Sequence, residues 1–158
     1  MQKFSDEYWM SQALKLAQKA FDKNEVPVGC LLVADNKIIS KGYNLKEDLQ
    51  TPLAHAEILA IHRAAIKQNS WRLENSTLYV TLEPCTMCSG TILQARIKRV
   101  VYATKDPKAG SVDSLYKLLN DSRLNHQVEV KSGVLEDQAS SLLKLFFKKL
   151  RLEKKNKI

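Results

Sequence analysis

The chain has 158 residues, of which 25 are Lys or Arg and 17 are Asp or Glu, so its formal net charge is +8; 44% of its residues are hydrophobic. A chain of this length buries about two thirds of its unfolded surface, which suffices for one globular domain without disulfides or a structural metal. The longest apolar run contains Pro27 and Gly29 and is far shorter than the roughly 20 residues of a membrane span. The N-terminal segment contains acids and no apolar signal core. We therefore expect a soluble protein without membrane insertion or secretion.

The cysteine content indicates a reducing compartment. Three cysteines are an odd number at low density, which argues against a disulfide framework and leaves thiols free to bind metal. We therefore expect a cytoplasmic protein.

The predicted elements alternate between helix and strand along the chain. Ser5 is a candidate N-cap, and the apolar residues that follow at helical spacing through Phe21 predict a first helix. Two β-rich runs flank the Asp35-Asn36 turn pair and predict a hairpin. In chain order, the hairpin strands at 26–33 and 37–41 precede a loop at 43–53, a helix at 54–67, a strand at 77–82, a helix from Pro84 to about 95, a strand at 99–103, a loop at 105–113, a short helix at 114–120, a strand at 128–131 and a helix from 136 to about 152. This order predicts a single three-layer α/β domain over residues 1–158.

The positive charge is concentrated at the C-terminal end. Residues 141–158 contain seven Lys or Arg and one Glu, which gives this helix and tail a net charge of +6. Such a block is typical of a surface that binds RNA, DNA or anionic lipid, and it is equally compatible with a solvated helix end.

Two short motifs predict a metal centre. His55 opens one predicted helix, and Cys85 and Cys88 open another, where residues three apart share a face. The positive potential of a helix N-terminus favours thiolates, so the two cysteines are suitable zinc ligands at neutral pH. Three protein ligands leave a fourth tetrahedral position for water, as in catalytic zinc sites. Glu57 lies two residues beyond His55, where it would hydrogen-bond that water and shuttle its proton.

The remaining candidate ligands are assigned to packing or surface positions. Cys30 lies in a predicted strand and is expected to be a small buried residue; His62 and His126 are expected to pack or to face solvent. A fourth protein ligand from this group would close the site and make it structural.

The motif H-x-E…P-C-x-x-C is the signature of zinc-dependent nucleobase deaminases. The chain resembles the bacterial tRNA-specific adenosine deaminases more closely still, in order and spacing over about 4–151. The segments that carry this resemblance are EYWM, EVPVG, AHAEI, LYVTLEPCTMCSG, RIKRVVYATKD, NHQVEV and LLKLFFKKLR, together with Asn44.

The resemblance implies a three-layer α/β/α cytidine-deaminase-like fold with a five-stranded mixed sheet, a homodimer, and a flipped-out adenosine over one zinc ion per subunit. It implies that His55, Cys85 and Cys88 hold zinc and that Glu57 shuttles protons. The substrate contacts that it implies are Asn44 on the nucleoside, Val26 and the His55-Ala56 backbone lining the pocket, Asp106 and Lys108 facing ribose and phosphate, and Phe147 and Arg151 meeting flanking nucleotides.

The resulting hypothesis is an enzyme that deaminates the wobble adenosine of a tRNA anticodon to inosine, using a zinc-activated water and no small organic cofactor. The partner is then the anticodon stem-loop, whose unpaired bases cost little to extrude. Two alternatives remain open from the residues alone. One is a free nucleobase or nucleoside deaminase acting on guanine or cytosine, and the other is a non-catalytic zinc-stabilised RNA-binding module.

Overall fold

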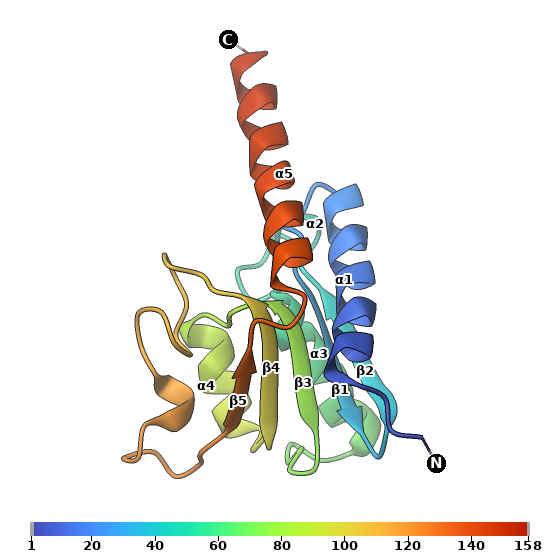
Figure 1. Cartoon of the computed structure of the whole chain (residues 1–158), viewed down its shortest axis with the longest axis vertical. Helices are drawn as coiled ribbons and strands as arrows, with labels where there is room; N and C mark the ends of the chain where they lie inside the picture. Colours follow the sequence, from blue (N-terminus) through green and yellow to red (C-terminus); the bar gives the residue numbers. More distant parts are fainter. Residues whose placement is uncertain (1, 158) are drawn as a thin grey trace.

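The structure is a computed structural model and describes residues 2–157. At its centre is one mixed sheet of five strands in the order β2-β1-β3-β4-β5 (Figure 1). β1 runs antiparallel to both of its neighbours, whereas β3, β4 and β5 are parallel to one another. The strands are β1 (Gly29–Ala34), β2 (Lys37–Tyr43), β3 (Thr77–Leu82), β4 (Arg99–Thr104) and β5 (Glu129–Ser132).

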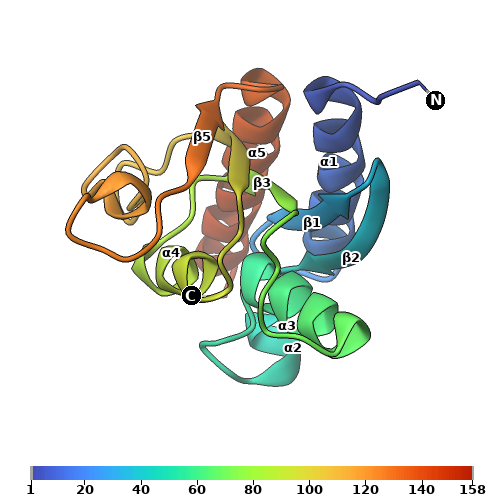
Figure 2. The same ribbon diagram turned by 90° about the horizontal axis from the view of Figure 1, so that it is seen from below.

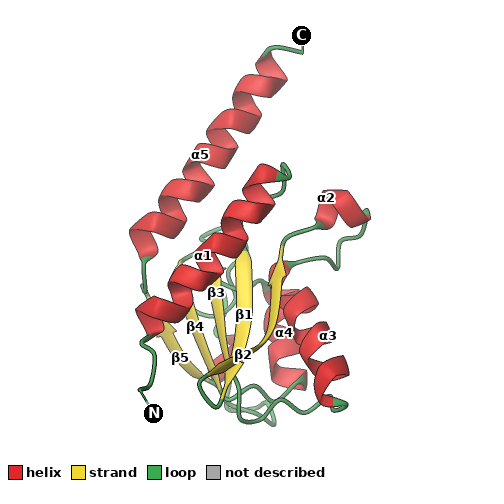
Figure 3. Cartoon of the chain, turned by 90° about the vertical axis from the view of Figure 1, so that its right-hand side faces the viewer, coloured by secondary structure: helices red, strands yellow, loops and turns green. Residues whose placement is uncertain are grey.

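Helices cover both faces of the sheet. α1 (Asp6–Asp22) and α5 (Glu136–Lys155) lie on one face, and α3 (Ala56–Gln68) and α4 (Thr86–Gln94) lie on the other (Figures 2 and 3). α2 (Lys46–Leu49) and the 3₁₀ turn η1 (Leu118–Asn120) are short. The three-layer α/β prediction is therefore confirmed. Within residues 2–157, no helix combines the length and apolar composition that crossing a membrane requires.

Each strand divides its side chains between two cores because successive residues point to opposite faces. On β4, Val100 and Tyr102 pack toward α3 and α4, whereas Val101 and Ala103 pack toward α1 and α5. The same alternation places Cys30 in the first core, fully buried as predicted. The helices are thereby held at fixed positions over the sheet.

Gly42 sets the distance between β2 and α3. A Cβ atom at this position would overlap the backbone of Ala56 and Ala60, so only glycine permits the close approach. The contact places the N-terminal end of α3 beside the end of β2.

The strand pairing brings four connections to one end of the sheet. Gly29, where β1 begins, pairs with Tyr43, where β2 ends, and Leu82 pairs with Thr104 at the ends of β3 and β4. The residues before β1 and after β2, β3 and β4 therefore meet at this end. In open sheets of this kind, ligands bind in the crevice beyond the carboxyl ends of the strands.

Some predicted element boundaries are wrong, and hydrogen bonds explain the differences at β1 and α2. β1 starts at Gly29 rather than at 26 because the Val28 N–H donates to the Val26 carbonyl across Pro27, in a tight turn. The predicted loop at 43–53 contains α2, whose Glu47 and Asp48 N–H groups donate to the buried Glu25 carboxylate.

Differences also occur around the later helices. α4 begins at Thr86, so Pro84 precedes the helix instead of forming its first turn. The helix predicted at 114–120 is reduced to η1 because the backbone of Ser114 binds the Glu83 side chain. α5 continues to Lys155 instead of ending at about 152. On this helix Phe146 is buried, whereas its neighbour Leu145 is 55% exposed.

A partly buried ion-pair network ties α1 to the parallel strands. Asp6, whose side chain is 14% exposed, accepts two hydrogen bonds of 2.9 Å from Arg99 on β4, one of 2.7 Å from Tyr79 on β3 and one of 3.0 Å from Lys131 on β5. The Arg99 guanidinium, with Tyr79 and Lys131, holds the pKa of Asp6 well below its usual range despite the opposing effect of burial.

We predict that Asp6→Asn lowers the free energy of unfolding by about 1–3 kcal/mol at pH 7. Because the folded-state pKa of Asp6 is depressed, its stabilisation is complete above the unfolded value of about 3.9 and is lost as the pH falls toward the folded value. Urea unfolding at pH 7 and pH 3 tests this, with the exposed Glu7→Gln as the matched control. An Asp6→Asn penalty that does not shrink at pH 3 would contradict the assignment.

Candidate active site

Three sulfur and nitrogen atoms gather where α3 and α4 begin. His55 is the N-cap residue of α3, Cys85 is the N-cap residue of α4, and Cys88 lies in the first turn of α4. The ligand atoms of all three lie within 4.8 Å of one another. His55 Nδ1 lies 3.6 Å from Cys85 Sγ and 3.5 Å from Cys88 Sγ.

This geometry fits a zinc ion. Zn–S and Zn–N bonds of about 2.3 and 2.0 Å at a tetrahedral angle place sulfur and nitrogen about 3.5 Å apart. Within the described part of the chain, no fourth His, Cys, Asp or Glu joins the group. His62 is exposed, and His126 Nε2 lies 2.7 Å from the Ile97 carbonyl oxygen, so both predictions for these histidines are confirmed.

The cluster favours the thiolate form, which binds metals, at Cys85. The hydrogen bond from the Cys88 thiol, supported by His55, lowers the pKa of Cys85 to about 3, and the same bond raises the pKa of Cys88. The hydrogen bond with Cys85 raises the pKa of His55. Negative charge on the Cys85 sulfur is therefore stabilised by Cys88, by His55 and by the N-terminus of α4.

Glu57 faces a small cavity beside the cluster. The cavity has a volume of about 170 Å³ and is also lined by His55, Cys85, Asn44 and Val26. Glu57 is 4% exposed, and burial raises its pKa above the usual value for a glutamate. A buried carboxyl group beside a candidate metal site is suited to accept and return a proton.

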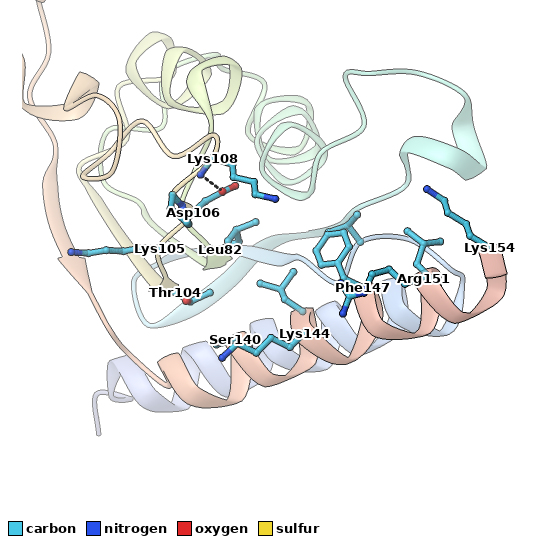
Figure 4. Close-up of a pocket in the computed structure, with 14 residues that line it drawn as sticks. Leu82, Thr104, Lys105, Asp106, Lys108, Ser140, Lys144, Phe147, Arg151 and Lys154 are labelled. Carbon is cyan, nitrogen blue, oxygen red and sulfur yellow. Dashed lines mark hydrogen bonds between the residues drawn. The ribbon is translucent and has the colours of Figure 1, made fainter.

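A larger groove adjoins the cavity and shares three lining residues with it, Val26, Leu82 and Asp106. Its volume is about 760 Å³. One wall is the segment after β4, and the other is a face of α5 (Figure 4). The charged and aromatic residues on its walls are Lys105, Asp106, Lys108, Lys144, Phe147, Arg151 and Lys154. The groove is therefore rich in cations and has an exposed aromatic ring on its α5 wall.

Comparisons with known proteins agree with this geometry. The model of the MafB19-like deaminase family matches residues 4–151. A tRNA-specific adenosine deaminase of Bacillus subtilis is 48% identical over 150 residues, which cover 95% of this chain and 93% of the relative. The chain belongs to the tRNA-specific adenosine deaminases.

Two further comparisons agree with this family assignment. A tRNA-specific adenosine deaminase of Haemophilus influenzae is 50% identical to this deaminase over 151 residues, covering 95% of this chain and 87% of the relative. A solved structure from studies of A-to-I editing by tRNA:A34 deaminases is 39% identical, with a TM-score of 0.83, and covers 86% of this chain and 99% of the other. This chain therefore shares its fold with that solved structure, and the five-stranded mixed sheet expected from the resemblance is confirmed.

The structure of the deaminase brings most of the predicted site residues to the cavity and the groove. Asn44 is 7% exposed and lines the cavity at the end of β2. Phe147, 42% exposed, lines the groove together with Lys108 and Arg151. The Ala56 side chain is fully buried in the core and does not line the cavity, so the expected contact through the His55-Ala56 backbone stays a prediction.

Asp106 has a structural task that the sequence motif does not reveal. Its side chain lines both hollows, and its Oδ1 atom accepts hydrogen bonds from the backbone of Lys108 at 3.0 Å and of Ala109 at 3.2 Å. Asp106 therefore organises the turn that presents Lys108 to the groove.

Several lining residues of the deaminase were not predicted. Lys46 lines the cavity because α2 folds over it, and Lys144 and Lys154 line the groove on the same face of α5 as Phe147. A helical projection would have grouped the α5 residues.

Glu83 also lines the cavity. Burial raises its pKa, but hydrogen bonds from Asp113, Ser114 and Asp106 outweigh this effect and lower the pKa below its usual range.

We predict that Cys88→Ala loses tightly bound zinc at neutral pH because only two ligands remain in the cluster. Cys30→Ala is the matched control, since it removes an equally buried thiol from the core. Metal analysis of the purified variants after dialysis checks this. One equivalent of zinc retained by Cys88→Ala, or lost from Cys30→Ala, would contradict the ligand assignment.

Proposed function

We propose that this chain hydrolyses the wobble adenosine of a tRNA anticodon to inosine, with release of ammonia. One observation carries the proposal: the cavity beside the His55, Cys85 and Cys88 cluster adjoins, and shares three lining residues with, a groove lined by cations and an aromatic ring. A site for a free base needs only the cavity, whereas a nucleotide chain also requires the groove.

His55, Cys85 and Cys88 would hold one zinc ion per subunit. Zinc, when bound, would act as a Lewis acid that lowers the pKa of a water in the open position. The separations of the three ligand atoms support this choice of metal. The absence of a fourth ligand among residues 2–157 favours an open catalytic site over a closed structural one.

Glu57 would move the protons of the reaction. It takes one proton from the attacking water and delivers it to the ring nitrogen next to C6 of adenine. It then transfers the second proton of that water from the new C6 hydroxyl to the amino group, which departs as ammonia. Its burial, which raises its pKa above the usual value for a glutamate, supports this role because it favours uptake of a proton.

The cavity and the groove would divide the recognition of the substrate. Asn44 and Val26 would hold the flipped nucleoside, with the His55-Ala56 backbone at the edge of the base. Asp106 and Lys108 would face ribose and phosphate, and Phe147 and Arg151 would meet the flanking nucleotides. A base stacked on an exposed aromatic ring gains about 1–3 kcal/mol, and cations along the groove attract the phosphate backbone.

The proposal extends to the domain, the cellular compartment and the oligomeric state of the protein. The chain would act as one deaminase domain over residues 1–158, with the basic helix and tail at about 141–158 reaching toward tRNA. It would work in the cytoplasm, where tRNA is used, and as a homodimer, as the family resemblance implies.

We predict that Glu57→Gln keeps its zinc but deaminates an anticodon stem-loop at least about 100-fold more slowly, since general acid–base catalysis contributes 10²–10⁴-fold. The assay follows inosine in single-turnover reactions, with zinc content measured on the same samples. An undiminished rate in a zinc-loaded variant would exclude the proton-transfer role.

We also predict that Lys154→Ala weakens tRNA binding and makes the plot of log affinity against log salt shallower by about 0.7–0.9, the value of one phosphate contact. Lys148→Ala is the matched control, because this exposed lysine lies on the same helix but outside the groove. Binding titrations at several salt concentrations measure both slopes. Equal slopes for the two variants would mean that the groove face of α5 is not the RNA-binding face.

A further inference from the structure

A buried carboxylate beside the cavity has no part in the proposed chemistry. Glu83 lies between β3 and Cys85 and is 2% exposed. Its Oε1 atom accepts hydrogen bonds from the Asp106 N–H, at 3.0 Å, and from the Ser114 hydroxyl. Its Oε2 atom accepts from the N–H groups of Val112, Asp113 and Ser114 at 3.0, 2.8 and 2.9 Å. One side chain therefore binds both ends of the segment 106–114.

The segment is closely fitted around this carboxylate. A Cβ atom at Gly110 would overlap the carboxyl group of Glu83, so the chain passes against the side chain at a distance that only glycine allows. Ser111 adds a second attachment, because its N–H and hydroxyl donate to the Pro84 carbonyl at 2.9 and 3.2 Å. The Ser111 hydroxyl also lies 2.7 Å from the Ser89 hydroxyl on α4.

These attachments connect two parts of the site. The residues that hold the segment, Glu83 and Pro84, directly precede the metal-ligand candidate Cys85 in the chain. The segment itself begins with Asp106 and carries Lys108 into the groove (Figure 4). The groove wall is thus held at a set distance from the metal-ligand cluster by a single short stretch of backbone.

We propose that Glu83 is a positioning residue for RNA, which fixes the segment 106–114 so that Lys108 meets a phosphate while the target base occupies the cavity. The inference rests on the proposed function, because it assumes that a nucleotide chain lies in the groove. Glu83 then acts on the binding of a polynucleotide through Lys108.

A double-mutant cycle with hydrogen exchange tests the proposal. Glu83→Gln keeps the size of the side chain but brings an amide group against the backbone donors. We expect kcat/KM for an anticodon stem-loop to fall about tenfold, mainly through KM, because the backbone donors of the segment lose their charged acceptor and no longer hold Lys108 in place. Lys108→Ala should then cost much less in the Glu83→Gln background than in the wild type.

Local amide exchange distinguishes the proposed role of Glu83 from a general loss of stability. Amide exchange at Asp106, Val112, Asp113 and Ser114 should become faster in Glu83→Gln, while zinc content is retained. Glu25→Gln is the matched control, because Glu25 is 1% exposed and its carboxylate accepts from Glu47 at 3.0 Å and Asp48 at 2.7 Å on the other side of the cavity. Its effect should add to that of Lys108→Ala within about twofold.

Gly110→Ala provides a second route if Glu83→Gln does not fold, since the added methyl group displaces the carboxylate and keeps its charge. It should show the same non-additivity with Lys108→Ala. Additive effects in both cycles, or unchanged amide exchange in the segment, would overturn the proposal. Loss of zinc from Glu83→Gln would also overturn it, because Glu83 would then support Cys85 and not the segment. A wild-type protein that cannot deaminate the stem-loop would refute the proposed function instead, and the exchange data would still report whether Glu83 anchors the segment.

Discussion

The convergence of two helix N-termini at one end of the sheet is the constraint on which the site depends. His55 and Cys85 each stand immediately before a helix, and their ligand atoms meet although 30 residues separate them. This requires that α3 and α4 lie side by side on one face and begin at the same end. The close contact at Gly42 and the parallel pairing of β3 with β4 provide that arrangement.

The same end of the sheet also determines where substrate is recognised. Asn44 follows β2 and Asp106 follows β4. The strand order that brings His55 and Cys85 to one end of the sheet therefore also places Asn44 and Asp106 around the same cavity. α5 crosses the opposite face and forms the far wall of the adjoining groove (Figure 4). Part of the net positive charge of the C-terminal segment thus lies on a wall of the groove, which composition alone could not distinguish from a solvated tail.

The sequence predicts the chemistry better than it predicts the loops. Helical and β periodicity located all five strands and the long helices, and the spacing of His55, Cys85 and Cys88 predicted their cluster, because these signals are local. α2 was missed, and the η1 region was predicted as a longer helix. Their backbone N–H groups bind the carboxylates of Glu25 and Glu83, which lie 22 to 31 residues earlier in the chain, a pairing that no local pattern encodes.

The most direct test of the central claim is to incubate the zinc-loaded protein with unfractionated tRNA that still carries adenosine at the wobble position, and to sequence the products. The account predicts conversion of adenosine to inosine at that position in one or a few tRNAs, and no comparable turnover of free adenosine, guanine or cytosine under the same conditions. Efficient turnover of a free base or nucleoside, with no inosine formed in any tRNA, would contradict it.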